Sequence, residues 1–220
     1  MANDILNGLS TNELGKEIQR LITEDQRSLP PRSKVFSAIA KLQKFDVLPE
    51  VGGVDEINKA VASGCIELNR GLSSTKGISS QFYAKELLFG SMFPGTLSAI
   101  GNGIYFAVPS KQDLLYTPLF PLVSVAALKY TRGETSGALV RAALKATAKI
   151  AQCDDLKQDL RENRNRAKRA GINDLGAFAA ALGFDAFAAD GVYDDTDERV
   201  FTVLNRGALI VQKVGVFVKN

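Results

Sequence analysis

The sequence predicts an α+β protein, and three observations support that class. Apolar residues recur at helical spacing through residues 11–63, whereas much of the later chain consists of short strand-like runs separated by glycine and serine. Hydrophobic residues make up 45% and charged residues 23% of the 220 positions, as in a globular protein with a full core. We therefore expect an N-terminal helical segment, 1–63, followed by one larger domain, 64–220.

Three amphipathic helices are expected in the N-terminal segment. Thr11 is a good N-cap for the first helix, which the prolines of LPPR at 29–32 end. Residues 33–45 and 54–64 repeat the helical spacing of apolar residues, and Gly64 suits the end of the third helix.

The larger domain is expected to be mostly strand, with helices between the strands. Its strand-like runs, rich in β-branched and aromatic residues, are 65–71, 103–108, 118–128 and 199–218. The clearest helices are expected at 135–149 and 154–171. An arginine-rich face of the second helix could contact phosphate, but acidic residues interleaved in the same stretch favour a solvated helix face.

Composition excludes several classes of function. The net charge of +3, from 27 basic and 24 acidic residues, is too balanced to predict a nucleic-acid or membrane partner. The absence of histidine excludes Ser-His-Asp and Cys-His catalysis, so carboxylates, tyrosines and arginines must carry any reaction.

Cys65 and Cys153 predict neither a zinc cluster nor a disulfide framework, and we expect free thiols in a reducing compartment. With no signal peptide and no membrane-length apolar run, an intracellular protein is expected.

The stretch GNGIYFA, residues 101–107, combines two glycines with a strand-like aromatic run. Glycine beside a strand usually indicates a positive φ or another group close to the backbone. A tight turn into a strand whose Tyr105 packs in the core explains the pattern, and so does a ligand lying against the main chain.

Four separated motifs, in this order, resemble the ADP-ribosyltransferase superfamily, and within it the compact bacterial and phage-encoded members. They are ASGCIELNRGLS, GNGIYFA, GFDAFAADG and ERVFTVLNRGALIV. The resemblance covers about residues 50–220 and does not include the N-terminal helices. It implies a split antiparallel β-sandwich that takes NAD as a substrate and needs no metal.

The first motif implies a binding role for Arg70 and Gly71. In the family, an Arg-Gly or His-Gly pair ends the first strand, and its polar side chain holds the adenine-ribose and phosphate side of NAD. An arginine fork makes charge-assisted hydrogen bonds to such oxygens, and the glycine lets a ligand approach the main chain. An ordinary surface arginine at a strand end is the alternative.

The second motif implies that nicotinamide lies under an aromatic ring. Gly101 and Gly103 would leave room for NAD, while Tyr105 and Phe106 alternate along a strand and point to opposite faces. By the family pattern Tyr105 faces the pocket and stacks on the cationic nicotinamide, an attraction of roughly 0.5 to 2 kcal/mol. Phe106 is then expected in the core.

The family's catalytic glutamate is where this sequence departs from the pattern. When VLNRGALIV is aligned with the family motif, the apolar Val200 or Phe201 takes the position of the glutamate. Glu198 is the nearest glutamate in the sequence. A bulge or a pairing shift could bring Glu198 to the pocket, where it would stabilise the charge that develops as nicotinamide leaves. The alternative is that Glu198 belongs, with Asp195 and Asp197, to a solvated loop and that no acid completes the site.

Three further features receive mainly structural interpretations. Residues 73–75, Ser-Ser-Thr, are expected to form a polar loop, and Phe184 and Asp185 are expected to shape a turn. Asn205 and Arg206 repeat the Asn-Arg-Gly of 69–71, which indicates two similar strand exits, although Arg206 could also serve phosphate.

The leading hypothesis from the sequence is a mono-ADP-ribosyltransferase that modifies a macromolecule, foremost a host protein, in the cytoplasm of the host cell. The acidic stretch 190–198 would dock the acceptor, and its charge suggests a basic target. Two alternatives remain: an NAD glycohydrolase with water as acceptor, and a transferase-fold scaffold without chemistry, such as a phage virion component. In the scaffold, the N-terminal helices would serve docking or self-association, or they would instead cover the sheet of the same chain.

Overall fold

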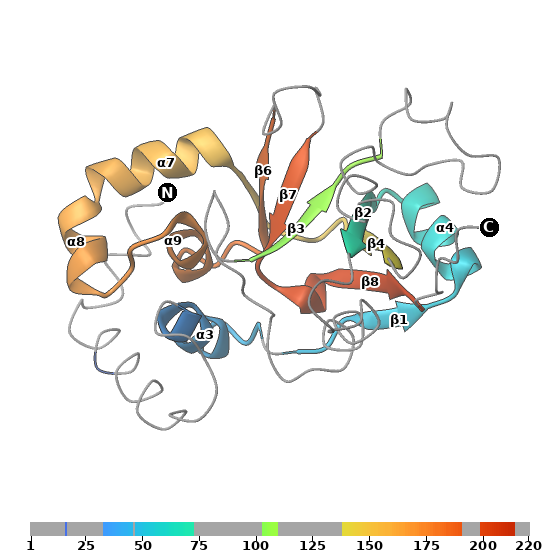
Figure 1. Cartoon of the computed structure of the whole chain (residues 1–220), viewed down its shortest axis with the longest axis horizontal. Helices are drawn as coiled ribbons and strands as arrows, with labels where there is room; N and C mark the ends of the chain where they lie inside the picture. The colour runs from blue at the N-terminus through green and yellow to red at the C-terminus, as the bar shows by residue number, and fades with distance from the viewer. Residues whose placement is uncertain are drawn as a thin grey trace.

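The computed structural model is an α+β protein whose mixed sheet carries helices at both of its ends (Figure 1). This confirms the predicted class. The structure describes residues 16, 33–45, 47–72, 103–109, 138–190 and 199–213. The expected helix after Thr11, apart from Lys16, and the expected strand at 118–128 lie outside these residues. No helix of the described residues is long and apolar enough to cross a membrane.

The strands of the described residues form one eight-stranded sheet in the order β1-β8-β4-β2-β3-β7-β6-β5. The edge strands β1 and β5 run parallel to their neighbours, and the other pairs are antiparallel. The strands are β1 (Glu50–Gly52), β2 (Ile66–Leu72), β3 (Ile104–Ala107), β4 (Ala138–Leu144), β5 (Ile150–Gln152), β6 (Ala186–Ala189), β7 (Val200–Val203) and β8 (Leu209–Gln212).

The sheet divides into two halves that meet between β2 and β3. Strand β2 pairs with β4 along its whole length, and β3 pairs likewise with β7. Within the described residues, β2 and β3 instead pair at one position, Asn69 opposite Ala107. In Figure 1, β1 and β8 of one half run roughly horizontally, whereas β6 and β7 of the other half run steeply.

Each half has its own helical cover. Helix α4 (Val54–Ala62) contacts β1, β4 and β8, whereas α7 (Cys153–Glu162) and α9 (Leu175–Ala181) contact β6 at the other end. Helix α3 (Ser33–Leu42) packs on α9, and α8 (Arg164–Arg169) continues α7. Both described helices of the N-terminal segment therefore pack on elements of the later chain, α4 on the sheet and α3 on α9.

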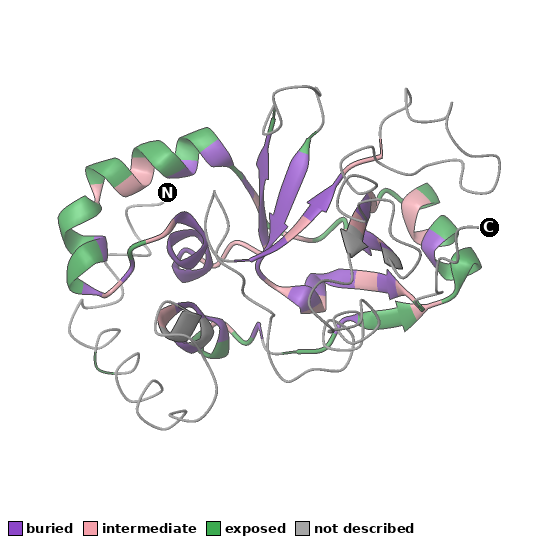
Figure 2. Ribbon diagram, viewed as in Figure 1, coloured by how far each residue is buried: buried purple, intermediate pink, exposed green. Residues whose placement is uncertain are grey.

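The apolar faces of these helices explain their positions. All seven residues of α9 are buried, and the side chain of its N-cap, Asp174, accepts a hydrogen bond from the amide of Ala177 at 2.9 Å (Figure 2). Phe36 and Ile39 of α3 are buried in the same core. Helices α7 and α8, in contrast, are mostly exposed (Figure 2).

The helix expected at 135–149 was wrong, because residues Ala138–Leu144 form strand β4. The alanines, leucines and basic residues of this stretch favour a helix locally. In the fold, however, the strand lies between β2 and β8, and Val140, Ala142 and Leu144 are all fully buried. Long-range pairing and burial outweigh the local preference, as is common for short apolar runs.

Asp185 joins three parts of the second half, which confirms a structural role. Its carboxylate accepts hydrogen bonds from the amide of Lys149 at 2.8 Å and from Nδ2 of Asn205 at 2.7 Å. Its main-chain oxygen accepts from the amides of Leu204 and Asn205. Asp185 therefore fixes the start of β5 against the end of β7.

Candidate functional site

Arg70 and Tyr105 meet where the two halves of the sheet join. Arg70 lies near the end of β2, and its Nη1 donates a hydrogen bond to the main-chain oxygen of Tyr105 on β3, 2.8 Å away. Because the main-chain pairing of β2 with β3 is confined to Asn69 and Ala107 in the described residues, the arginine side chain extends the connection beyond that pair. Two residues from different motifs, 35 positions apart, are thus in direct contact.

The strand register places the Tyr105 and Arg70 side chains on opposite faces of the sheet. Tyr105 lies opposite Thr202, and Ala107, on the same face, lies opposite Asn69. Arg70 lies opposite Val140 and alternates with Asn69, so it begins on the other face. The guanidinium therefore reaches the main chain of Tyr105 from the face opposite the tyrosine ring.

The two aromatic residues of GNGIYFA have different environments. Phe106 is 1% exposed and belongs to the hydrophobic core, as expected. Tyr105 is only partly buried, so its ring is the one of the pair that keeps contact with solvent. This is the arrangement that a stacking role for Tyr105 would need.

Gly103 has a reason within the chain to be glycine. Its φ is +145°, and a Cβ built there would lie 2.4 Å from Cγ2 of Thr202 and 3.1 Å from the main-chain oxygen of Val203. The close approach of β7 therefore accounts for this glycine without a ligand. Gly71 lies within β2, and Gly101 is outside the described residues.

Glu198, together with Asp195 and Asp197, lies outside the described residues. Its flanks are described: Nε of Arg199 pairs with Oδ1 of Asp190 at 3.1 Å, across the ends of the acidic stretch. Val200 and Phe201, the positions that direct alignment gave to the catalytic acid, are each 2% exposed.

A partly buried ion pair that sequence reasoning missed lies on the Tyr105 face. Arg141 of β4 donates from Nε to Oε1 of Glu67 on β2 at 2.5 Å. Asn69, directly opposite Arg141, is completely buried on the same face. The single arginine in the apolar run ALVRAAL could have indicated an ion pair at this position of the sheet.

The second Asn-Arg-Gly motif has a structural role. Asn205 caps the short 3-10 helix η2 (Arg206–Ala208) by accepting a hydrogen bond from the amide of Gly207 at 3.0 Å. Arg206 is 1% exposed, so its side chain does not lie at the surface, where a phosphate would meet it.

Both cysteines of the chain are free thiols, as expected. Burial raises the pKa of the Cys153 thiol above its ordinary value of 9.0, and the nearby ammonium of Lys157 opposes part of that shift. Nζ of Lys157 donates a hydrogen bond to Oδ1 of Asp154, and this bond, followed by the charge of the Cys153 thiolate, raises the pKa of Lys157. The Cys153 thiol is therefore protonated at neutral pH and is a poor nucleophile.

Within the described part of the chain, no group of three or more cysteine, aspartate or glutamate side chains gathers where a metal ion could bind. Comparison of the chain with protein-family models, with curated proteins and with solved structures found no match. The features that bear on function are therefore the four sequence motifs and the geometry of the β2–β3 junction.

Proposed function

We propose that the protein is an NAD-dependent mono-ADP-ribosyltransferase that modifies a protein acceptor. The observation that carries the proposal is the hydrogen bond from Arg70 to the main chain of Tyr105. It connects, at one junction of the sheet and from opposite faces, the residue that would hold the phosphate side of NAD and the residue that would stack on nicotinamide.

The division of the sheet supports the same proposal. A split β-sandwich opens between two groups of strands, and the described strands divide at β2 and β3, the strands that carry Arg70 and Tyr105. Because the two side chains lie on opposite faces, NAD would pass between β2 and β3 beyond the Asn69–Ala107 pair, with its phosphates at the Arg70 guanidinium and its nicotinamide against the Tyr105 ring. The guanidinium of Arg70 would fix the main chain of Tyr105 as well as meet the ligand.

In the reaction, the bond between the ribose C1′ and the nicotinamide nitrogen breaks, and nicotinamide leaves with the bonding electrons. A nucleophile on the acceptor then attacks C1′ and loses its proton. Glu198 would stabilise the positive charge on the ribose and orient the 2′-hydroxyl. With water as the acceptor, the same residues would give NAD glycohydrolase activity.

A transferase-fold scaffold is the second candidate, and two observations favour it. Val200 and Phe201 are buried apolar residues at the positions where alignment expects the acid, and the close approach of β7 explains Gly103 without a ligand. The burial of the α3 face against α9 weighs against α3 as a free docking arm.

Labelled NAD incubated with the purified protein and a host lysate separates these functions. Transferase activity predicts nicotinamide release together with label on an acceptor, whereas glycohydrolase activity predicts release with no labelled band. Tyr105→Ala and Glu198→Gln should abolish release, while Tyr105→Phe, which keeps the ring, and Glu162→Gln, on the exposed face of α7, should retain it. A folded protein that releases no nicotinamide above the blank would contradict the transferase proposal and leave the scaffold.

A further inference from the structure

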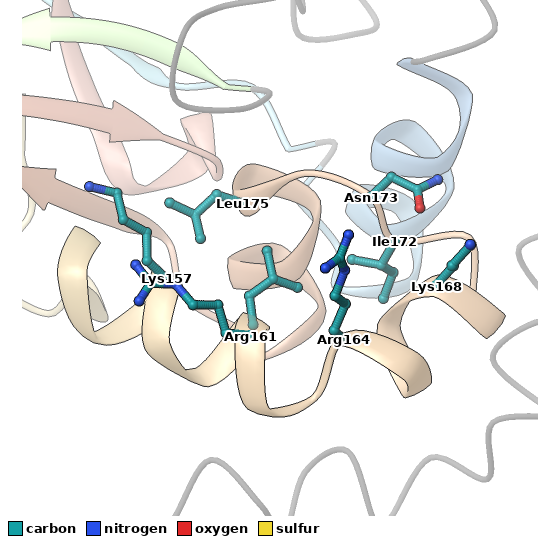
Figure 3. Close-up of a pocket in the computed structure, with 8 residues that line it drawn as sticks. Lys157, Arg161, Arg164, Lys168, Ile172, Asn173 and Leu175 are labelled. Atoms are coloured by element: carbon teal, nitrogen blue, oxygen red, sulfur yellow. The ribbon is translucent and has the colours of Figure 1, made fainter.

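A cavity with basic walls lies along α7 and α8, away from the strands that carry Arg70 and Tyr105. Its volume is about 510 Å³, within the range of small-molecule pockets. Its lining contains four cationic side chains and no carboxylate (Figure 3). The lining residues are Lys157, Leu160, Arg161, Arg164, Lys168, Ile172, Asn173 and Leu175.

The helical spacing of the charges explains why the cavity is basic although the sequence is mixed. The cations follow one another at steps of four, three and four residues through α7 and α8, and all four side chains line the cavity. Asp155, Asp159 and Glu162 follow at steps of four and three, offset from the cations, and none of them lines the cavity. Folding therefore separates charges that alternate in the sequence.

The cations of the cavity are largely available to a ligand. In the described part of the chain, Arg161, Arg164 and Lys168 have no carboxylate within ion-pair distance, whereas Lys157 pairs with Asp154 at 2.9 Å. Arg161, Arg164 and Lys168 are exposed. Several cationic side chains without a carboxylate partner around one cavity favour the binding of an anion that contacts more than one of them.

The cavity also has an apolar side. Ile172 and Leu175 are 1% and 7% exposed, and Leu160 is half-buried. Arg164 extends from the helix toward Ile172 (Figure 3). Charged and apolar groups thus meet within one hollow, which suits a ligand with both kinds of surface.

We propose that this cavity binds a small phosphorylated molecule that carries a polyphosphate group and an apolar or aromatic part, as nucleotides do. The arginines would hold the phosphate oxygens, and the ring or apolar part would lie against Leu160, above the buried Ile172 and Leu175. A concave site with an apolar side and a low net protein charge of +3 favour such a ligand over a nucleic-acid strand, which needs an extended basic surface. The site is independent of the proposed NAD junction.

Fluorescence titration of the full chain with trinitrophenyl-ATP tests the proposal. The variant Arg161→Gln/Arg164→Gln should bind the probe at least about tenfold more weakly, because two charge-assisted hydrogen-bonding groups are lost. The control Lys59→Gln/Arg169→Gln removes the same charge from exposed residues that do not line the cavity, and it should bind like the wild type.

Competition experiments identify the ligand class. Unlabelled ATP should displace the probe more effectively than tripolyphosphate, because only ATP contacts the apolar side, and a twelve-nucleotide oligothymidylate should compete poorly. No probe binding, equal weakening in both variants, equal competition by tripolyphosphate, or stronger competition by the oligonucleotide would each overturn the proposal. Nicotinamide release should be unchanged in Arg161→Gln/Arg164→Gln, so failure here is distinguishable from failure of the transferase proposal.

Discussion

Nη1 of Arg70 donates a hydrogen bond to the main-chain oxygen of Tyr105 at 2.8 Å, at the place where the two halves of the sheet meet. The arginine approaches from one face of the sheet, and the tyrosine ring lies on the other. A single side chain thereby connects β2 to the main chain of β3 beyond the position where the strands pair. The contact couples the stability of the junction to the geometry of the proposed site.

Removal of that hydrogen bond should weaken the fold measurably. Arg70→Met keeps the length of the side chain but has no donor, and it should lower the free energy of unfolding by about 1 to 2 kcal/mol. Arg70→Lys should lose less, since it retains a charged donor without the planar fork. Urea unfolding of both variants gives the comparison, and an Arg70→Met midpoint equal to that of the wild type would contradict a structural role for the contact.

Substitution of Gly103 should be costly because both its backbone and its surroundings require glycine. Gly103→Ala combines a φ of +145° with a Cβ placed 2.4 Å from Cγ2 of Thr202, and we expect a loss of about 3 kcal/mol. Thr202→Ser removes that methyl group, so it should recover about 1 kcal/mol in the Gly103→Ala background. A double-mutant cycle by urea unfolding measures the coupling, and strict additivity would show that the two residues do not conflict.

Loss of the Asp185 carboxylate should separate the start of β5 from the end of β7. Asp185→Ala removes two side-chain hydrogen bonds, to the amide of Lys149 and to Nδ2 of Asn205, and should cost about 2 to 3 kcal/mol. Asp154→Ala, whose carboxylate is exposed and pairs with Lys157, is the matched control and should cost less than about 1 kcal/mol. Thermal unfolding that affects both variants equally would contradict the role assigned to Asp185.

The buried thiol of Cys153 should make stability fall in alkaline solution. Because its pKa in the folded protein is raised above 9.0, the unfolded chain releases this proton first, and the free energy of unfolding falls as the pH rises through about 9. Below that pH the thiol is protonated in both states and contributes no slope. Urea unfolding between about pH 8 and about pH 10 should therefore show a steeper decline for the wild type than for Cys153→Ala. Parallel curves would exclude the thiol as the cause.

Local sequence patterns predicted those helices and strands in which the local preference of the residues matches the structure that they adopt in the fold. The strand-like runs at 65–71 and 103–108 predicted β2 and β3, and the apolar spacing at 33–45 and 54–64 predicted α3 and α4. The helix expected at 154–171 corresponds to α7 and α8. Strand β4 was mistaken for a helix because its run of alanines and leucines indicates a buried segment but does not show whether the apolar residues recur at helix or strand spacing. The short strands β1 and β5 carry too few residues to show any periodicity.

The candidate site was predictable in its residues more than in its geometry. The motifs selected Arg70 and Tyr105, but their contact depends on the pairing of distant strands, which no local pattern reports. The opposite faces of the two side chains follow from the register of Asn69 with Ala107. The basic cavity was not predicted because acidic and basic residues alternate along this stretch of sequence. The spacing of four, three and four residues between the cations could have indicated it, and these cations are Lys157, Arg161, Arg164 and Lys168.

The most direct measurement is the binding of NAD to the purified protein, followed by the quenching of tyrosine fluorescence and by isothermal titration calorimetry. If NAD lies at the β2–β3 junction, the wild type and Tyr105→Phe bind it, and Tyr105→Ala binds it at least about fivefold more weakly through loss of the stacked ring. Absence of NAD binding by the folded wild type, or equal binding by Tyr105→Ala, would contradict the assignment of this junction as the NAD site.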